Sequence, residues 1–260
     1  MTADLEKRKQ IGDRFLSGSG VEFGPGTAPS HYRNVKNLTF ADKRTPAEIE
    51  ALFGSKIGYK VLSVEQALAS FVRSADFVVA HHVIEHIANP IRALSGWLEM
   101  IRDEGNLFLS LPNEKNGCEA QRLPTPFSHV LDDYVFDRDE DHFDSKLHVP
   151  HFINQWEHFQ PGGFHYSKDR NLKHYVEASL SEARRNGHDL HWHTYTLEVI
   201  SAVVEAAAWF ADRSVEWLHR EDNEGASYLV ASIGTPTAMP PFIKDEVRRL
   251  DHALSVLRRT

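Results

Sequence analysis

The sequence contains a single cysteine, Cys118, among its 260 residues. One cysteine cannot form a disulfide within the chain and cannot build a zinc site from several thiolates. No apolar run approaches the roughly 18 residues that a membrane-spanning helix needs. The charged start of the chain is not followed by the apolar segment of a signal peptide. We therefore expect a cytoplasmic protein without a membrane span.

Positive charge is also in short supply, with 29 Lys and Arg residues against 37 Asp and Glu residues and a net charge of −8. A chain of this charge lacks the broad basic surface of proteins that bind nucleic acid or anionic membranes, so neither is an expected partner. Hydrophobic residues make up 41% of the chain and charged residues 25%. These values are typical of globular domains and exclude disordered, collagen-like and coiled-coil chains.

A strand followed by a helix is the pattern that recurs through the first hundred residues. Five β-prone runs alternate with helical segments there, which predicts βαβ units, a parallel sheet and right-handed crossovers. Two later runs, 214–219 and 227–234, flank a polar turn and predict an antiparallel hairpin that closes the sheet. The early runs are 20–27, 37–41, 59–62, 76–80 and 105–111, and helices are expected at 5–16, from 45, and at 64–71, 90–101, 169–186, 197–211 and 242–257.

Residues 113–167 break this pattern. They are rich in His, Asp, Pro and aromatic residues and show no sustained period, apart from a short helix expected near Ser128. An irregular segment this long inside a compact domain is typically a functional cover or a disordered loop, and its aromatic side chains favour the cover. We therefore expect a single domain over residues 1–260, with a largely irregular lid at 113–167.

A glycine turn follows the first predicted strand, in the sequence Glu22-Phe23-Gly24-Pro25-Gly26-Thr27. Gly24 and Gly26 carry no Cβ atoms, so a ligand can approach the backbone there. The turn alone also fits an ordinary tight connection, because the third glycine of a dinucleotide-binding fingerprint is missing. Asp42 strengthens the interpretation of the turn as a ligand site. An acid that ends the next strand, about 20 residues later, can accept hydrogen bonds from two ribose hydroxyls.

The stretch after the fourth predicted strand is His81-His82-Val83-Ile84-Glu85-His86, followed by Pro90. Together with 22–26, Asp42 and 103–113, it resembles the class I S-adenosylmethionine-dependent methyltransferases, in particular a bacterial group with a His-Val-Leu-Glu-His type turn. The resemblance implies an α/β, Rossmann-like fold with a mostly parallel seven-stranded sheet, an antiparallel closing hairpin and a His-rich insertion after strand five. It also implies S-adenosylmethionine as the cofactor.

The resemblance implies roles for single residues as well. The sequence departs from the family where 102–105 replaces a Pro-Gly-Gly turn, and where the acid expected after strand three has no clear match, although Glu65 is close. The implied cofactor contacts are Glu22, Gly24, Pro25 and Gly26 under the methionine part, Asp42 at the ribose, Ser63 and Val64 along the adenine, and Ala80, His81 and His82 beside the sulfonium and the substrate.

Histidine is unusually frequent, with 16 residues in the chain. Histidine titrates near neutral pH and can take the proton of a methyl acceptor. His129 and Asp133 share a face if their segment is helical, and His191 and His193 point the same way if theirs is a strand. These four could assemble a base with its orienting carboxylate or a divalent metal site, although paired histidines on a strand are also commonly surface or packing residues.

His82 is a further candidate catalytic residue, because ligands of open parallel sheets bind outside the carboxyl ends of the strands. Glu85 and His86 follow it closely and have a simpler interpretation, in which they cap a helix and hydrogen-bond to loops. We favour this structural role for His86, since the pair occurs across family members with unlike substrates.

The expected function is methyl transfer from S-adenosylmethionine to a small-molecule or saccharide acceptor, with an oxygen as the favoured methyl-accepting atom and a nitrogen as the second choice. The alternative is a non-catalytic cofactor- or metal-binding module that works through a His-rich surface. The acceptor class rests on analogy with the family.

Overall fold

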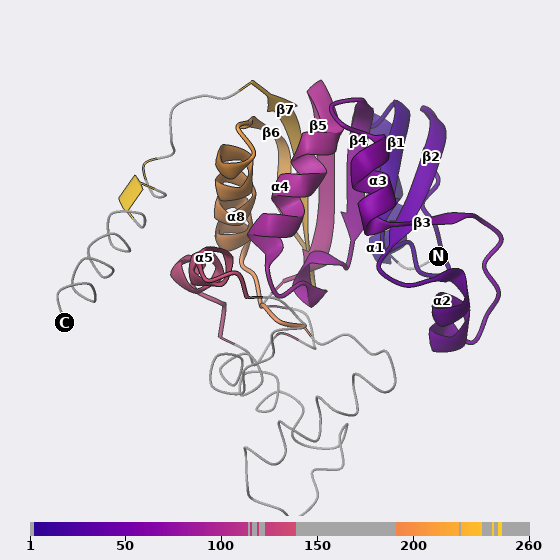
Figure 1. Cartoon of the computed structure of the whole chain (residues 1–260), viewed down its shortest axis with the longest axis horizontal. Coiled ribbons are helices and arrows are strands. Elements are labelled where there is room, and N and C mark those ends of the chain that lie inside the picture. The colour runs from indigo at the N-terminus through magenta and orange to yellow at the C-terminus, as the bar shows by residue number, and fades with distance from the viewer. Residues whose placement is uncertain are drawn as a thin grey trace, which may run out of the picture.

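Seven strands form one sheet in the computed structural model of the chain (Figure 1). The structure describes residues 3–113, 115, 119, 123–138, 191–223, 225–235, 241, 244 and 245. The strand order is β3-β2-β1-β4-β5-β7-β6, and only the pairs β5–β7 and β6–β7 are antiparallel. The predicted parallel sheet with an antiparallel closing hairpin is therefore confirmed. The strands are β1 (Gly18–Phe23), β2 (Val35–Asp42), β3 (Val61–Ser63), β4 (Ala75–His81), β5 (Ile101–Pro112), β6 (Ser214–Asp222) and β7 (Ala226–Gly234).

Helices pack on both faces of this sheet (Figure 1). Side chains alternate between the two faces along a strand. In β4, accordingly, Val78 and Ala80 belong to the core that packs against α4 and α8, and Phe77 and Val79 belong to a second core that includes Ile11 of α1. The helices are α1 (Ala3–Phe15), α2 (Pro46–Phe53), α3 (Val64–Ser70), the 3-10 helix η1 (Ile84–His86), α4 (Pro90–Met100), α5 (Phe127–Val135) and α8 (Leu197–Phe210).

Capping residues fix where the helices begin after β2, β3 and β4. Thr45 and Glu48 form the reciprocal capping box of α2, as their spacing predicts, and Ser63 caps α3 in the same way. Asn89 accepts a hydrogen bond from the backbone of Arg92 and caps α4. The three connections are thereby held at the carboxyl edge of the sheet, where a ligand site is expected.

The start of β5 differs from the prediction. The strand was expected from Gly105, with 102–105 as a turn, but it begins at Ile101. Its register against β4 shifts between Ala75 and Phe77, and Glu104 has a φ of 62°. A bulge therefore absorbs the extra residues, so that polar side chains can sit inside the strand without ending it.

The β-prone run 191–196 is not a strand. Its one bridge to the described residues joins Tyr195 to Asn113. The backbone bonds to loops instead, because the N–H of Trp192 donates to the carbonyl of Glu85 at 2.7 Å and the N–H of Thr125 donates to the carbonyl of Thr194 at 2.8 Å. The prediction of a strand there is wrong, and the segment serves to tie the η1 region to the segment before α5.

The expected lid is described only in part. Helix α5 confirms the helix predicted near Ser128. The remainder of the lid from 139 onward, the helix expected at 169–186, most of that expected at 242–257, and Cys118 lie outside the described residues. Within the described part of the chain, no helix has both the length and the apolar character needed to cross a bilayer.

Candidate functional site

A cavity of about 680 Å³ opens at the carboxyl edge of the sheet. Gly24, Asp42 and His82 line it from the connections after β1, β2 and β4. In the strand order, β2 lies on one side of β1 and β4 lies on the other, so the order in which strands are added to the sheet reverses at β1. Ligands of open α/β sheets bind at such a reversal. The apolar part of the lining includes Phe23, Leu52, Phe53, Val64, Leu68 and Trp97.

The glycine turn after β1 requires glycine for steric reasons. Gly24 and Gly26 have φ angles of 62° and 58°, in the left-handed region that other residues seldom adopt. A Cβ atom on Gly24 would lie 2.6 Å from Cγ2 of Val83. The turn is held in place by the N–H of Gly24, which donates to the carbonyl of Ala41 at 2.9 Å, and by the hydroxyl of Tyr59, which donates to the carbonyl of Gly26.

Asp42 lines the same cavity as the glycine turn. It ends β2, and its side chain is only 6% exposed. The backbone N–H of Arg44 donates to Oδ1 of Asp42 at 2.8 Å, which fixes the carboxylate at the cavity wall. The two elements that the sequence predicts for nucleoside binding therefore meet on one cavity.

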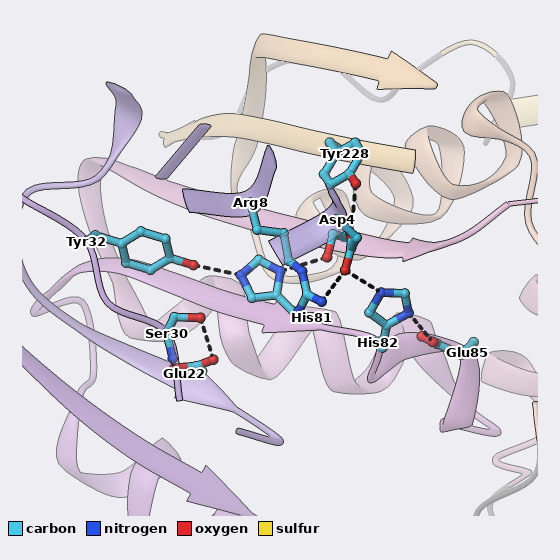
Figure 2. Close-up of polar contacts among 10 residues, drawn as sticks. Asp4, Arg8, Glu22, Ser30, Tyr32, His81, His82, Glu85 and Tyr228 are labelled. Carbon is cyan, nitrogen blue, oxygen red and sulfur yellow. Dashed lines mark hydrogen bonds and ion pairs between the residues drawn. The ribbon is translucent and has the colours of Figure 1, made fainter. Parts of the chain in front are cut away.

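His82 lies between two carboxylates at the end of β4 (Figure 2). Its Nε2 atom is 3.5 Å from Asp4, and its Nδ1 atom is 3.4 Å from Glu85. Burial alone would lower the pKa of His82, but hydrogen bonds and charge from these carboxylates outweigh it and raise the pKa to about 9. Since His82 is then an imidazolium at neutral pH, it is a cationic group at the cavity and not a free base.

A second group of side chains surrounds Glu85, which is 1% exposed. The rings of His86 and His191 lie with their centroids 4.5 Å apart and nearly perpendicular, at 82°. Nδ1 of His191 is 2.5 Å from Oε1 of Glu119, and the hydroxyl of Thr194 donates to the other oxygen of Glu119. One ligand-type atom from each of Glu85, His86 and His191 lies within 4.8 Å of the others.

The expected capping role of Glu85 and His86 is not observed. The 3-10 helix η1 has no side-chain cap hydrogen bond. Burial would raise the pKa of Glu85, but the hydrogen bond from His82 and the charges of His86 and His191 lower it overall. Glu85 is thus an ionised, buried carboxylate whose partners are imidazoles.

The predicted pair His129 and Asp133 does share one face of α5, with Nε2 of His129 3.4 Å from Oδ2 of Asp133. His193 approaches the same carboxylate at 3.8 Å and also contacts the carbonyl of Ala88 at 3.1 Å. Arg138 donates to Oδ1 of Asp133 at 2.9 Å. Burial raises the pKa of Asp133 to about 7, although the hydrogen bond and charge of Arg138 act against it.

The idea that His129, Asp133, His191 and His193 form one site is therefore corrected. His191 contacts Glu119 and His86, whereas His193 contacts Ala88 and Asp133. Residues two apart in an extended segment are roughly 6–7 Å apart along the chain, so each side chain reaches a different neighbour. The structure brings the four residues into two adjacent groups.

A family model described as a methyltransferase domain matches residues 6–179. The chain belongs to the methyltransferase domain family, and the resemblance to the class I S-adenosylmethionine-dependent enzymes is confirmed. No curated protein sequence matches the chain.

Solved structures with a similar fold have low sequence identity to this methyltransferase domain. An S-adenosylmethionine-dependent methyltransferase from Clostridium acetobutylicum is 10% identical, with a TM-score of 0.45, over 89% of this chain and 90% of that one. The N-terminal domain of EvdMO1 is 12% identical, with a TM-score of 0.40, over 91% and 84%. The CMeT domain of citrinin polyketide synthase is 12% identical, with a TM-score of 0.40 over 85% of this chain, which spans only 47% of that structure.

Several residues predicted to bind the cofactor lie beside the cavity and do not line it. Ser63 caps α3, and Pro25 and Ala80 are not among the lining residues, whereas Val64 is. His81 is buried on the α1 side of the sheet, where its ring nitrogens meet the hydroxyls of Tyr32 at 2.7 Å and Ser110 at 2.8 Å. Burial lowers the pKa of His81 well below its ordinary value. Direct cofactor contacts of these residues stay a prediction.

Glu22 is also on this side of the sheet (Figure 2). Its two carboxylate oxygens accept hydrogen bonds from the backbone N–H and the hydroxyl of Ser30, at 2.9 and 2.8 Å. Burial raises the pKa of Glu22 from 4.5 to about 7 against these hydrogen bonds. The folded protein therefore binds a proton here that the unfolded chain releases between these two pH values.

We expect Glu22→Gln to remove a pH dependence of stability in the methyltransferase domain. Because the folded-state pKa is raised, the wild-type free energy of unfolding should fall as the pH rises from 4.5 to about 7, by about 2 kcal/mol relative to the variant. Urea unfolding followed by circular dichroism at several pH values measures this difference. Parallel curves for the two proteins across this range would contradict the prediction.

Two residues of the site have no signal in the sequence pattern. Asp4 reaches His82 from α1, where it also accepts hydrogen bonds from Tyr228 at 2.7 Å and from Arg8 (Figure 2). Glu119, which is itself in neither a helix nor a strand, reaches His191. Only the fold brings these carboxylates to histidines that are more than seventy residues away in the sequence.

Proposed function

We propose that the protein transfers the methyl group of S-adenosylmethionine to a hydroxyl oxygen of a small-molecule or glycan-type acceptor in the cytoplasm. One observation carries the proposal: the cavity joins a nucleoside-binding half, Gly24 and Asp42, to a half with titratable groups, His82 and His86. The first half suits the cofactor, and the second suits an acceptor that must lose a proton. The net charge of −8 argues against nucleic acid as the acceptor.

The reaction needs an in-line approach of the acceptor oxygen to the methyl carbon. A lone pair of the oxygen forms the new C–O bond, while the S–CH₃ bond breaks and its electron pair stays on sulfur, giving S-adenosylhomocysteine. The hydroxyl proton leaves toward the group of Glu85, His86 and His191, which borders the cavity through His86. His82 is not assigned as the base, since its pKa of about 9 keeps it protonated.

An amine acceptor would have less need of such a group, because a neutral amine attacks without first losing a proton. The buried carboxylate with its two imidazoles therefore favours oxygen over nitrogen. His129 and His193 are not assigned to this step, because Asp133 beside them already pairs with Arg138.

The test uses S-adenosylmethionine with a tritiated methyl group and the full chain. Monosaccharides, nucleotide sugars and polyhydric phenols serve as hydroxyl acceptors, and primary amines of similar size serve as the comparison. We expect methyl ethers from at least one hydroxyl acceptor, and strongly reduced formation of them by Asp42→Ala when S-adenosylmethionine is limiting. Exclusive methylation of amines would contradict O-methylation, and cofactor binding without any methyl transfer across the panel would favour the non-catalytic module.

A further inference from the structure

The group of Glu85, His86 and His191 has the composition of a metal site. Two imidazoles and one carboxylate are ligands that Zn²⁺ and related first-row divalent cations prefer. We propose that these three side chains bind one such cation at the edge of the cavity. The inference rests on the proposed function, because the role we give the cation is to hold the hydroxyl of the methyl acceptor.

The distances are suitable for a cation. The three ligand-type atoms lie within 4.8 Å of one another. Zinc bonds to nitrogen and oxygen are about 2.0–2.2 Å long, so that ligand atoms of a tetrahedral site are about 3.4 Å apart. Small rotations of the side chains would bring the three ligand atoms from within 4.8 Å of one another to the spacing of about 3.4 Å. The rings of His86 and His191 are already in edge-to-face contact, with centroids 4.5 Å apart.

Glu119 provides the support that histidine ligands usually have. Metal-binding histidines almost always donate their second ring N–H to a carboxylate or carbonyl, which fixes the tautomer and the orientation of the ring. Nδ1 of His191 lies 2.5 Å from Oε1 of Glu119, so a cation would be bound through Nε2. Thr194 holds the other oxygen of Glu119 and thereby orients the carboxylate.

The burial of Glu85 is a second reason to expect a cation. Its carboxylate is 1% exposed, and neither oxygen has a well-formed hydrogen bond among the described residues, since the contact with His82 is long. Nδ1 of His82 approaches Oε1 of Glu85 at 3.4 Å. A buried carboxylate requires compensation by hydrogen bonds, by charge or by a metal. A divalent cation between Glu85 and the two histidines would supply it.

The neighbouring group of His129, Asp133 and His193 is a weaker candidate, although its atoms are equally close. Arg138 already places a positive charge 2.9 Å from Asp133. Nε2 of His193 is engaged with the carbonyl of Ala88. Asp133 thus already accepts a hydrogen bond from a permanent cation, whereas neither oxygen of Glu85 has one among the described residues, so the structure favours the group around Glu85.

The position of the proposed site explains how a cation would serve methyl transfer. His86 lines the cavity, and three protein ligands leave a coordination position for an oxygen from the acceptor. A hydroxyl coordinated to a divalent cation ionises more readily, so it becomes a better nucleophile near neutral pH. With the cation bound, Glu85, His86 and His191 would act as its ligands and not as the proton acceptor, and the hydroxyl proton would pass to a solvent water molecule at the cavity.

The experiment measures Zn²⁺ binding to the full chain after dialysis against a chelator, by calorimetry. We expect one tight equivalent in the wild-type protein. His191→Ala should weaken it by about 100-fold or more, and Glu119→Gln should weaken it by about 10- to 100-fold, the usual effect of losing an outer-sphere carboxylate. His129→Ala is the matched control from the neighbouring group and should keep the tight equivalent.

Binding of S-adenosylhomocysteine to each variant is measured in parallel, which shows that the variant is folded. A tight equivalent that survives in His191→Ala, or that is lost in His129→Ala instead, would overturn the inference. So would a wild-type protein that binds S-adenosylhomocysteine but no Zn²⁺, and that result would leave the proposed methyl transfer intact. Failure of the proposed function is recognised separately, by the absence of methyl ethers in the tritium assay.

Discussion

Asp42→Ala is expected to weaken the binding of S-adenosylhomocysteine by about 100-fold. Asp42 lies on the cavity wall with the glycine turn, and its carboxylate is held there by the N–H of Arg44. The ribose hydroxyls donate to one ionised carboxylate, and its removal costs at least one such charged hydrogen bond, worth about 2–3 kcal/mol. This free energy corresponds to a change in Kd of roughly 30- to 150-fold. Calorimetry with the wild type and the variant measures it directly.

Asp76→Ala is the matched control for this prediction. Asp76 is also an aspartate on a strand of the sheet, but it lies near the start of β4, where it accepts hydrogen bonds from Ser19 at 2.7 Å and Arg102 at 2.7 Å. It is remote from the carboxyl edge, so its loss should leave the affinity for S-adenosylhomocysteine unchanged. An equal loss of affinity in both variants, or none in Asp42→Ala, would refute the assignment of Asp42 to the ribose.

Arg213→Met is expected to lower the free energy of unfolding by about 3–5 kcal/mol. The guanidinium of Arg213 is fully buried and donates to the carbonyls of Leu98, Ile101 and Gly234, at 3.1, 2.7 and 3.1 Å. Each of these hydrogen bonds has a charged donor. Methionine has no donor, so the three buried carbonyls would lose these hydrogen bonds. Since domains are stable by only about 5–15 kcal/mol, the loss is severe. Urea unfolding followed by circular dichroism gives the value.

Arg102→Met removes an arginine of the same sheet that pairs with Asp76 while its own side chain is 47% exposed. Exposed ion pairs contribute about 0–1 kcal/mol, so this control should unfold almost as the wild type does. A loss below about 1 kcal/mol in Arg213→Met would mean that water replaces the guanidinium at the three carbonyls.

The fold could be predicted from the sequence because its signals are local. The strands β2, β3 and β4 are short runs followed by capping residues, such as Thr45 with Glu48, which fix where the next helix begins. The start of β5 was missed because a bulge at Glu104 lets polar residues continue the strand. The segment 191–196 was mistaken for a strand because its β-prone residues are bonded to loops, which no local pattern reveals.

The sequence predicted the part of the site that depends on local motifs and missed the part that depends on contacts between distant segments. The glycine turn and Asp42 belong to contiguous motifs, and the structure places them on one cavity. His82 was expected there too, but its ionisation could not be foreseen, since the pKa depends on Asp4 from a helix more than seventy residues away. The grouping of His191 with Glu119, apart from His193, depends likewise on contacts between distant segments.

The contacts of Asp4 with both Tyr228 and His82 tie the first turn of α1 to a histidine that lines the cavity. An affinity tag or fusion partner joined just ahead of this turn would pull on the counter-ion of His82. Trimming of the first turn by a protease would remove that counter-ion altogether, and His82 would then give up its proton at a lower pH. Protein preparations that differ in the residues ahead of α1 would therefore differ in the pKa of His82, while the sheet itself stayed the same.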